Sequence, residues 1–244
     1  MTHPKLDEFV QKLKAAVSDN LKSVILYGSA VTGEFHTKHS DLHLLCVVDR
    51  ADAKQIEAFH EPVQWWTKQG NPPPLVFTLE ELRRSADVFT IELLDMKSHR
   101  KILLGEDVLA SFSVPLHYHA MQVERELRTD WLRLRQSMIA APQNSRKKPK
   151  IYLDLMVKSF SSFAALFRHA LIALGEPPPA TKREAIDRIG KFASADPSGF
   201  YAILEHREGK REAQEIDVEK TLNLYFAFVE AVTNEFDRRF DARK

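Results

Sequence analysis

The stretch that most constrains the fold of this chain runs from Leu26 to Val48 and reads LYGSAVTGEFHTKHSDLHLLCVV. An apolar run at 24–27 ends abruptly at Gly28-Ser29. About a dozen residues later, Ser40-Asp41 leads into a second apolar run at 44–48. Short apolar runs bounded by turn residues predict two strands joined by a polar connection.

The second run predicts a strand with two distinct faces, because successive side chains of a strand point to opposite sides. One face carries Asp41, His43, Leu45 and Val47, and the other carries Leu42, Leu44, Cys46 and Val48. The single cysteine of the chain therefore lies on an apolar face. A lone cysteine excludes an internal disulfide framework and fits a reducing compartment.

The arrangement of strand, Gly-Ser turn and carboxylate-bearing strand suits a polyphosphate. Gly28 lets the backbone approach a phosphate closely, and Ser29 can donate a hydrogen bond to that phosphate from the start of a helix. Ser40 and Asp41 open the next strand beside this turn. The pattern predicts phosphate binding by Gly28, Ser29 and Ser40, with Asp41 as the candidate catalytic residue.

These residues resemble the signature of the polymerase-beta-like nucleotidyltransferase superfamily, in which a hydrophobic strand and Gly-Ser precede Asp-x-Asp or Asp-x-Glu on the next strand. Gly28-Ser29, Ser40 and Asp41 fit this signature, and the resemblance covers roughly residues 20–110. His43 stands where the family carries its second carboxylate. The resemblance implies a minimal, kanamycin-nucleotidyltransferase-like domain with a degenerate Asp-x-Asp motif.

The same resemblance implies a two-metal site, in which carboxylates hold Mg²⁺ because this hard ion prefers oxygen ligands. The family draws a third carboxylate from a neighbouring strand, but the expected neighbour here, 75–77, is wholly apolar. The nearest acids in sequence are Glu80, Glu92 and Asp95. We therefore expect an eroded site, with Asp41 and His43 as its remaining metal-binding candidates.

Several of these residues have two interpretations. Asp41 either binds a metal or ribose, or caps the strand or turn. The string formed by His36, His39, Asp41 and His43 is either a set of polar loop residues or a site for Zn²⁺, which imidazole suits better than Mg²⁺. Glu92 and Asp95 are interpreted as surface acids rather than catalytic groups. The basic run at 146–150 is interpreted as a solvated linker rather than a nucleotide contact.

The net charge of the chain bears on which partners are expected. The net charge of +1 over 244 residues gives no bulk electrostatic reason to expect nucleic acid or an anionic membrane as a partner. No apolar run approaches the roughly 20 residues needed to span a bilayer, and the N-terminus lacks a signal-peptide core. The expected location is cytoplasmic.

The first half of the chain, 1–114, alternates helices and strands. An amphipathic helix is predicted at 4–18, a second at 51–69 and a short one at 80–88, with a third strand at 75–78. The segments 89–97 and 101–104 follow. This alternation predicts a nucleotidyltransferase-like α/β (α+β) domain with a small mixed sheet.

The second half, 115–244, predicts an antiparallel helical bundle. Helices are expected at 116–138 and 151–174, separated by the basic linker at 142–150. A third helix is expected to start with a capping box of Thr181 and Glu184, a fourth at Asp196-Pro197, and a last one after Asp217. The Arg and His pair that marks HEPN ribonucleases is missing from the sequence, which argues against that activity.

The helix at 151–174 is apolar around nearly its full circumference, so most of its sides must be covered. Either the bundle encloses it completely, or an open stripe packs against the first domain or a second copy of the chain in a homodimer.

Three functions remain open from the sequence. The first is a degenerate nucleotidyltransferase that binds a nucleotide or another phosphorylated ligand as a regulatory module. The second is an active enzyme that transfers an adenylyl group to a small molecule or protein, with a metal site rebuilt from Asp41, His43 and a later acid. The third is a structural protein whose bundle associates with a partner.

Overall fold

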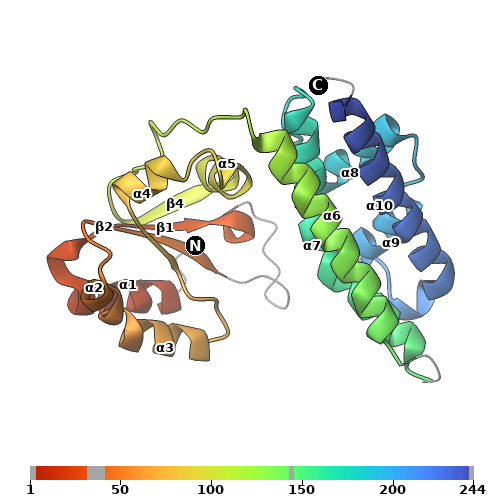
Figure 1. Cartoon of the computed structure of the whole chain (residues 1–244). Helices are drawn as coiled ribbons and strands as arrows, with labels where there is room; N and C mark the ends of the chain where they lie inside the picture. Colours follow the sequence, from red (N-terminus) through yellow and green to blue (C-terminus); the bar gives the residue numbers. More distant parts are fainter. Residues whose placement is uncertain (1–3, 32–41, 143–145, 242–244) are drawn as a thin grey trace. The chain divides into compact units, whose positions relative to one another are not determined.

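The computed structural model describes residues 4–31, 42–142 and 146–241 and divides into two compact units, 1–115 and 116–244 (Figure 1). This division adjoins the predicted domain boundary between 114 and 115. His36, His39, Ser40 and Asp41 lie outside the described residues.

The N-terminal unit is built on a mixed sheet. Its described strands are β1 (Leu21–Tyr27), β2 (His43–Val48), β3 (Leu75–Thr78) and β4 (Arg100–Gly105), in the order β3-β2-β1-β4. β1 is antiparallel to both β2 and β4, and β3 is parallel to β2. The predicted small mixed sheet is confirmed, and β3 spans the predicted residues.

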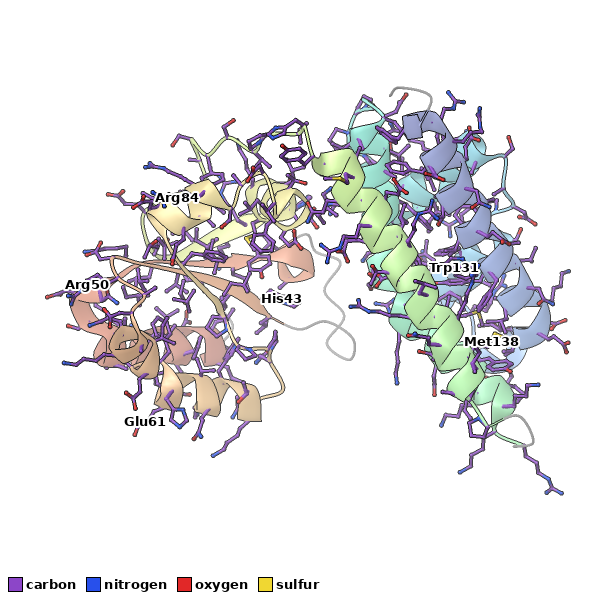
Figure 2. All side chains as sticks on the ribbon, viewed as in Figure 1. His43, Arg50, Glu61, Arg84, Trp131 and Met138 are labelled. Atoms are coloured by element: carbon purple, nitrogen blue, oxygen red, sulfur yellow. The ribbon has the colours of Figure 1, made fainter. Side chains whose placement is uncertain are left out.

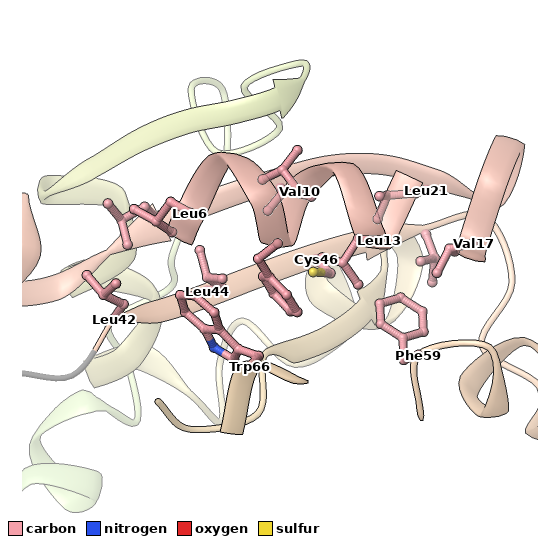
Figure 3. Packing of buried hydrophobic residues seen from close by; sticks show 14 residues of the cluster. Leu6, Val10, Leu13, Val17, Leu21, Leu42, Leu44, Cys46, Phe59 and Trp66 are labelled. Atoms are coloured by element: carbon pink, nitrogen blue, oxygen red, sulfur yellow. The ribbon is translucent and has the colours of Figure 1, made fainter. Parts of the chain in front are cut away.

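Helices cover both faces of this sheet. They are α1 (Pro4–Val17), α2 (Ala53–Glu57), α3 (His60–Lys68), α4 (Leu79–Arg84) and α5 (Thr90–Ser98). Leu42, Leu44, Cys46 and Val48 join the core that α1 and α3 build on one face (Figure 3). Leu45 and Val47 join the core on the other face, with Leu82 and Leu93 from α4 and α5. The predicted alternation along β2 is therefore confirmed.

The core under α1 contains an aromatic stack. The rings of Phe9 and Trp66 lie 4.5 Å apart at 15°, and both side chains are fully buried. Trp66 also donates a hydrogen bond from Nε1 to the carbonyl oxygen of Pro72. Burial raises the pKa of Cys46, which lies in the same core, to about 12. This thiol is a small apolar packing group.

The single helix predicted at 51–69 is wrong, because the chain forms two helices there. Asp52 caps α2 by accepting a hydrogen bond from Gln55 N at 3.2 Å. The chain then turns at Phe59, and α3 begins at the next residue. The Phe59 side chain is buried in the core that α1 and α3 build on one face of the sheet. Burial of one aromatic side chain at the junction outweighs the continuous helical pattern.

The described secondary structure of the C-terminal unit is entirely helical. Its α-helices are α6 (His119–Ala140), α7 (Lys148–Ala173), α8 (Lys182–Ala193), α9 (Ser198–Arg207) and α10 (Val218–Asp241). Their core is rich in aromatic rings, with Phe200 stacked on Tyr225 at 4.0 Å and 10°. α7 begins three residues before its predicted start, because Pro149 suits the first turn of a helix.

Side-chain caps start α8 and α10 at the predicted residues, whereas the N-cap of α9 is Pro197, which has no side-chain cap, and Asp196 lies one residue before it. The side chain of Thr181 accepts a hydrogen bond from Glu184 N, Asp196 accepts one from Ser198 N, and Asp217 accepts one from Lys220 N. The capping box at Thr181 is only half formed, because the Glu184 carboxylate accepts from Ala180 N instead.

Most of the large apolar side chains of α7 are buried, and α7 packs against α6, α8, α9 and α10 of its own unit. Beyond its first turn, which exposes Pro149 and Lys150, its exposed residues are polar: Asp154, Lys158, Ser161 and Ser162. Other apolar residues of α7 are half-buried, and both predicted alternatives, full enclosure in the bundle and an open apolar stripe, stay predictions. By length and composition alone α7 could cross a membrane, contrary to the sequence-based expectation, but half of its most apolar window is buried inside the protein. The core helix of a bundle passes the same test, so the observation is weak evidence for a membrane span.

Candidate nucleotide site at the end of the sheet

The Gly-Ser turn leaves the sheet where β1 ends. After Tyr27 the chain enters a single 3₁₀ turn, Gly28–Ala30, closed by a hydrogen bond from Val31 N to Gly28 O of 3.0 Å. Gly28 has a φ of +80°, a conformation that favours glycine. A Cβ atom built there would meet only His43 Cδ2, at 3.9 Å, among the described residues. The backbone conformation favours the glycine, and the described part of the chain leaves room beside it.

The structure describes only part of the other residues that were predicted to bind phosphate. The backbone of Ser29 belongs to the 3₁₀ turn, while its side chain, like all of Ser40 and Asp41, lies outside what the structure describes. Their roles stay predictions.

His43 is the first residue of β2 and pairs in register with Tyr27 of β1. Its side chain is exposed, and the two rings lie 5.7 Å apart at 34° (Figure 2). Side chains paired in this way across antiparallel strands are in direct contact. The imidazole therefore lies at the same end of the sheet as the Gly28 turn.

A carboxylate that is distant in sequence also acts on this end of the sheet. Burial raises the pKa of Tyr27 to about 12, and the negative charge of Glu92 contributes to the rise. Glu92 is exposed on α5. Sequence reasoning treated it as a surface acid, and no sequence signal links it to Tyr27, because the proximity depends on how α5 packs against the sheet.

The other acids of the unit have different surroundings. Glu80 lies on α4 and forms an ion pair with Arg84 at 2.5 Å. Asp95 lies one turn after Glu92 on α5 and is half-buried. β3 carries no acidic residue, as its sequence predicts. None of these three acids lies on a strand of the described sheet.

Arg100 of β4 pairs with Tyr27 on the side of β1 opposite to His43. Its guanidinium binds both carboxylate oxygens of Asp107, at 2.8–3.1 Å. These hydrogen bonds hold the pKa of Asp107 below its usual range. Arg100 therefore closes the loop after β4 and is not available to a ligand.

The described residues do not fit a two-magnesium site. No group of three or more histidine, cysteine, aspartate or glutamate side chains among them could hold a metal ion. The described groups linked to this end of the sheet are the imidazole of His43, which lies beside Gly28, and the carboxylate of Glu92, whose charge acts on Tyr27, whereas Mg²⁺ prefers oxygen donors in octahedral geometry. We therefore derive no chemical step through a metal.

Comparison with known proteins supports the same family. Residues 6–104 match the family model described as a nucleotidyltransferase domain. The chain is similar in structure to spectinomycin adenyltransferase AAD(9) from Enterococcus faecialis, solved with ATP and spectinomycin. That similarity has a TM-score of 0.57 at 14% sequence identity and covers 94% of this chain and 100% of the other. No curated protein matches this chain. The N-terminal unit is thus a nucleotidyltransferase domain of the polymerase-beta-like superfamily, followed in the same chain by a helical bundle.

Proposed function

We propose that this protein binds a nucleotide or another phosphorylated ligand at the Gly28-Ser29 turn and acts as a binding or regulatory module with little nucleotidyl transfer. The observation that carries the proposal is the backbone at Gly28, which has a positive φ and, among the described residues, meets only His43 Cδ2 within 4 Å of its Cβ direction. A glycine in this conformation allows a phosphate to approach the backbone.

Weak transfer follows from the residue at the start of β2. The family places a carboxylate where this chain has His43, and that residue lies beside the Gly28 turn. Loss of metal-held charge stabilisation costs several kcal/mol of the activation barrier, and about 1.4 kcal/mol corresponds to a factor of ten in rate. The expected rate is therefore lower than that of an enzyme with an intact site by orders of magnitude.

Calorimetric titration with ATP, GTP and their diphosphates tests the binding site. We expect the wild-type protein to bind, and the double variant Gly28→Val with Ser29→Ala to lose most of its affinity. Gly70→Val is the matched control, because Gly70 also has a positive φ, of +87°, and has no atom near its Cβ direction. Unchanged affinity in the double variant would place the site elsewhere.

A transfer assay with labelled ATP tests the second part of the proposal. We expect little transfer by the wild-type protein, and more transfer after His43→Asp, which restores the Asp-x-Asp pattern. Robust transfer by the wild-type chain that is abolished by Asp41→Ala would refute the proposal of an eroded site.

That outcome would favour the second candidate function, an active transferase that moves an adenylyl group to a small molecule or protein. The observation in its favour is the proximity of Glu92 to Tyr27, which brings an acid from later in the chain towards the end of the sheet that carries His43. The similarity to an adenyltransferase solved with ATP and spectinomycin adds support. Transfer that falls after Glu92→Gln but is unaffected by Glu80→Gln would identify this arrangement.

Three further expectations stay predictions. They are a divalent cofactor (Mg²⁺ with the nucleotide, or Zn²⁺ at the histidine string), a cytoplasmic location, and a homodimer formed through the bundle. Sedimentation across a dilution series decides between dimer and monomer.

A further inference from the structure

The bundle contains a half-buried arginine without a carboxylate partner. Arg207, the last residue of α9, reaches α7 and donates hydrogen bonds to Val157 O at 2.7 Å and to Ser161 Oγ at 2.9 Å. Its guanidinium carbon lies 5.5 Å from the centre of the Phe160 ring. All of these partners are neutral.

The electrostatic surroundings of Arg207 agree with this geometry. Burial lowers its pKa, and the phenol of Tyr225 is the one group whose charge acts in the opposite direction. The guanidinium nevertheless stays charged, because arginine is not deprotonated in proteins. By contrast, Arg183, Arg188 and Arg211 in the same unit each form an ion pair with a glutamate.

Hydrogen-bond donors beside Arg207 are also uncommitted. Arg207 Nε–H, the hydroxyl hydrogen of Ser161 and the ammonium group of Lys158 have no acceptor among the described residues. Lys158 and Ser161 are exposed and lie three residues apart, so they are neighbours on the surface of α7. Asp154, an exposed acid four residues before Lys158 on α7, forms no ion pair with Lys158 in the described part of the chain.

We propose that Arg207, Ser161 and Lys158 form a binding site for a phosphate-class oxyanion on the α7–α9 face of the bundle. A guanidinium, a hydroxyl and an ammonium group all donate hydrogen bonds, and charge-assisted bonds to phosphate are among the stronger hydrogen bonds in proteins. A bound oxyanion neutralises the cation that no carboxylate of the described chain neutralises. Its residues belong to the C-terminal unit, whereas Gly28 belongs to the N-terminal unit.

The alternative role of Arg207 is purely structural, as a clamp between α9 and α7. The two roles differ in one measurable respect. A clamp contributes the same stability in any salt, whereas an anion that binds only the folded chain raises the melting temperature as its concentration rises.

The experiment compares thermal unfolding of the full chain in potassium phosphate and in potassium chloride of matched ionic strength. We expect phosphate to raise the Tm of the wild type, and Arg207→Gln to weaken phosphate binding by about tenfold or more. Arg125→Gln is the matched control, because Arg125 is an exposed arginine on α6 with no ion pair among the described residues, and it should respond as the wild type does.

The double variant Lys158→Gln with Ser161→Ala changes only exposed residues. It provides the same test if Arg207→Gln does not fold. It should also weaken phosphate binding, by several-fold. In the Gly28→Val and Ser29→Ala variant, phosphate should still raise the Tm through Arg207. This result would distinguish the Arg207 site from the proposed nucleotide site. A phosphate response in Arg207→Gln or in the Lys158 and Ser161 variant equal to that of the wild type overturns the proposal.

Discussion

The two ends of β1 differ in how tightly the chain packs around them. At the first end, Ser23 is fully buried and donates a hydrogen bond from Oγ to Glu106 O at 2.8 Å. Gly105, its partner on β4, has a φ of +73°, and a Cβ atom there would lie 1.8 Å from Lys22 O. At the other end, the Cβ direction of Gly28 is open up to His43, and the His43 side chain is exposed.

The comparison teaches that a positive φ alone does not identify a functional glycine. Gly105 and Gly28 both have this conformation, but only Gly105 is also required by the approach of a neighbouring backbone. The first end of the sheet is closed by its own chain. The second end has space and carries an exposed imidazole, and Glu92 acts electrostatically on Tyr27 there.

The largest expected effect is on stability at the closed end. Gly105→Ala should lower the free energy of unfolding by about 2–5 kcal/mol, and two costs contribute. Alanine is unfavourable in the left-handed conformation of residue 105, and its Cβ atom would overlap with Lys22 O. Gly28→Ala should lower it by only about 1–2 kcal/mol, from the backbone term alone. Urea unfolding of both variants measures the difference, and equal losses would contradict the comparison.

Side-chain deletions should give a smaller difference between the same two ends. Ser23→Ala removes one buried hydrogen bond and leaves Glu106 O without it, so a loss of about 1 kcal/mol is expected. His43→Ala removes an exposed side chain and should change stability by less than about 0.5 kcal/mol while altering ligand binding. A larger loss of stability for His43→Ala than for Ser23→Ala would mean that the second end is also structural.

The smallest effect concerns the ionisation of Tyr27. Its pKa is raised to about 12 in the folded chain, so folding favours the neutral phenol. That contribution to stability is fully present below the pKa of an unperturbed tyrosine, about 10, and is lost as the pH rises towards 12. Phenolate absorbance, measured as the difference between wild type and Tyr27→Phe, should show this titration. Glu92→Gln should lower the pKa of Tyr27 slightly, and a normal pKa in the wild type would show that the ring is more open to water.

The elements that the sequence predicts best are those set by local pattern. The alternation along β2 predicts the two faces because its apolar residues are buried on both sides of the sheet. The caps at Thr181 and Asp217 also follow from local hydrogen bonding. Such features depend on residues only a few positions apart.

Features that depend on distant residues were missed. The break before α3 requires a core pocket for Phe59, and the approach of Glu92 to Tyr27 requires the packing of α5. The segment 89–97 has little helical amphipathicity, so its sequence did not distinguish a helix from a strand. In the candidate site, Gly28 and His43 could be found from spacing alone, whereas Glu92 could not.

The order β3-β2-β1-β4 has a consequence for how the two units fold. β1 lies inside the sheet and needs β4, the last strand to be synthesised, as its second partner. Contacts between residues far apart in sequence form slowly, because a long loop must first close. The bundle packs α6 on α7 and α9 on α10, which are consecutive helices. The nascent N-terminal unit therefore exposes an unpaired edge of β1 until Arg100–Gly105 emerges, and this edge is where aggregation during synthesis should begin.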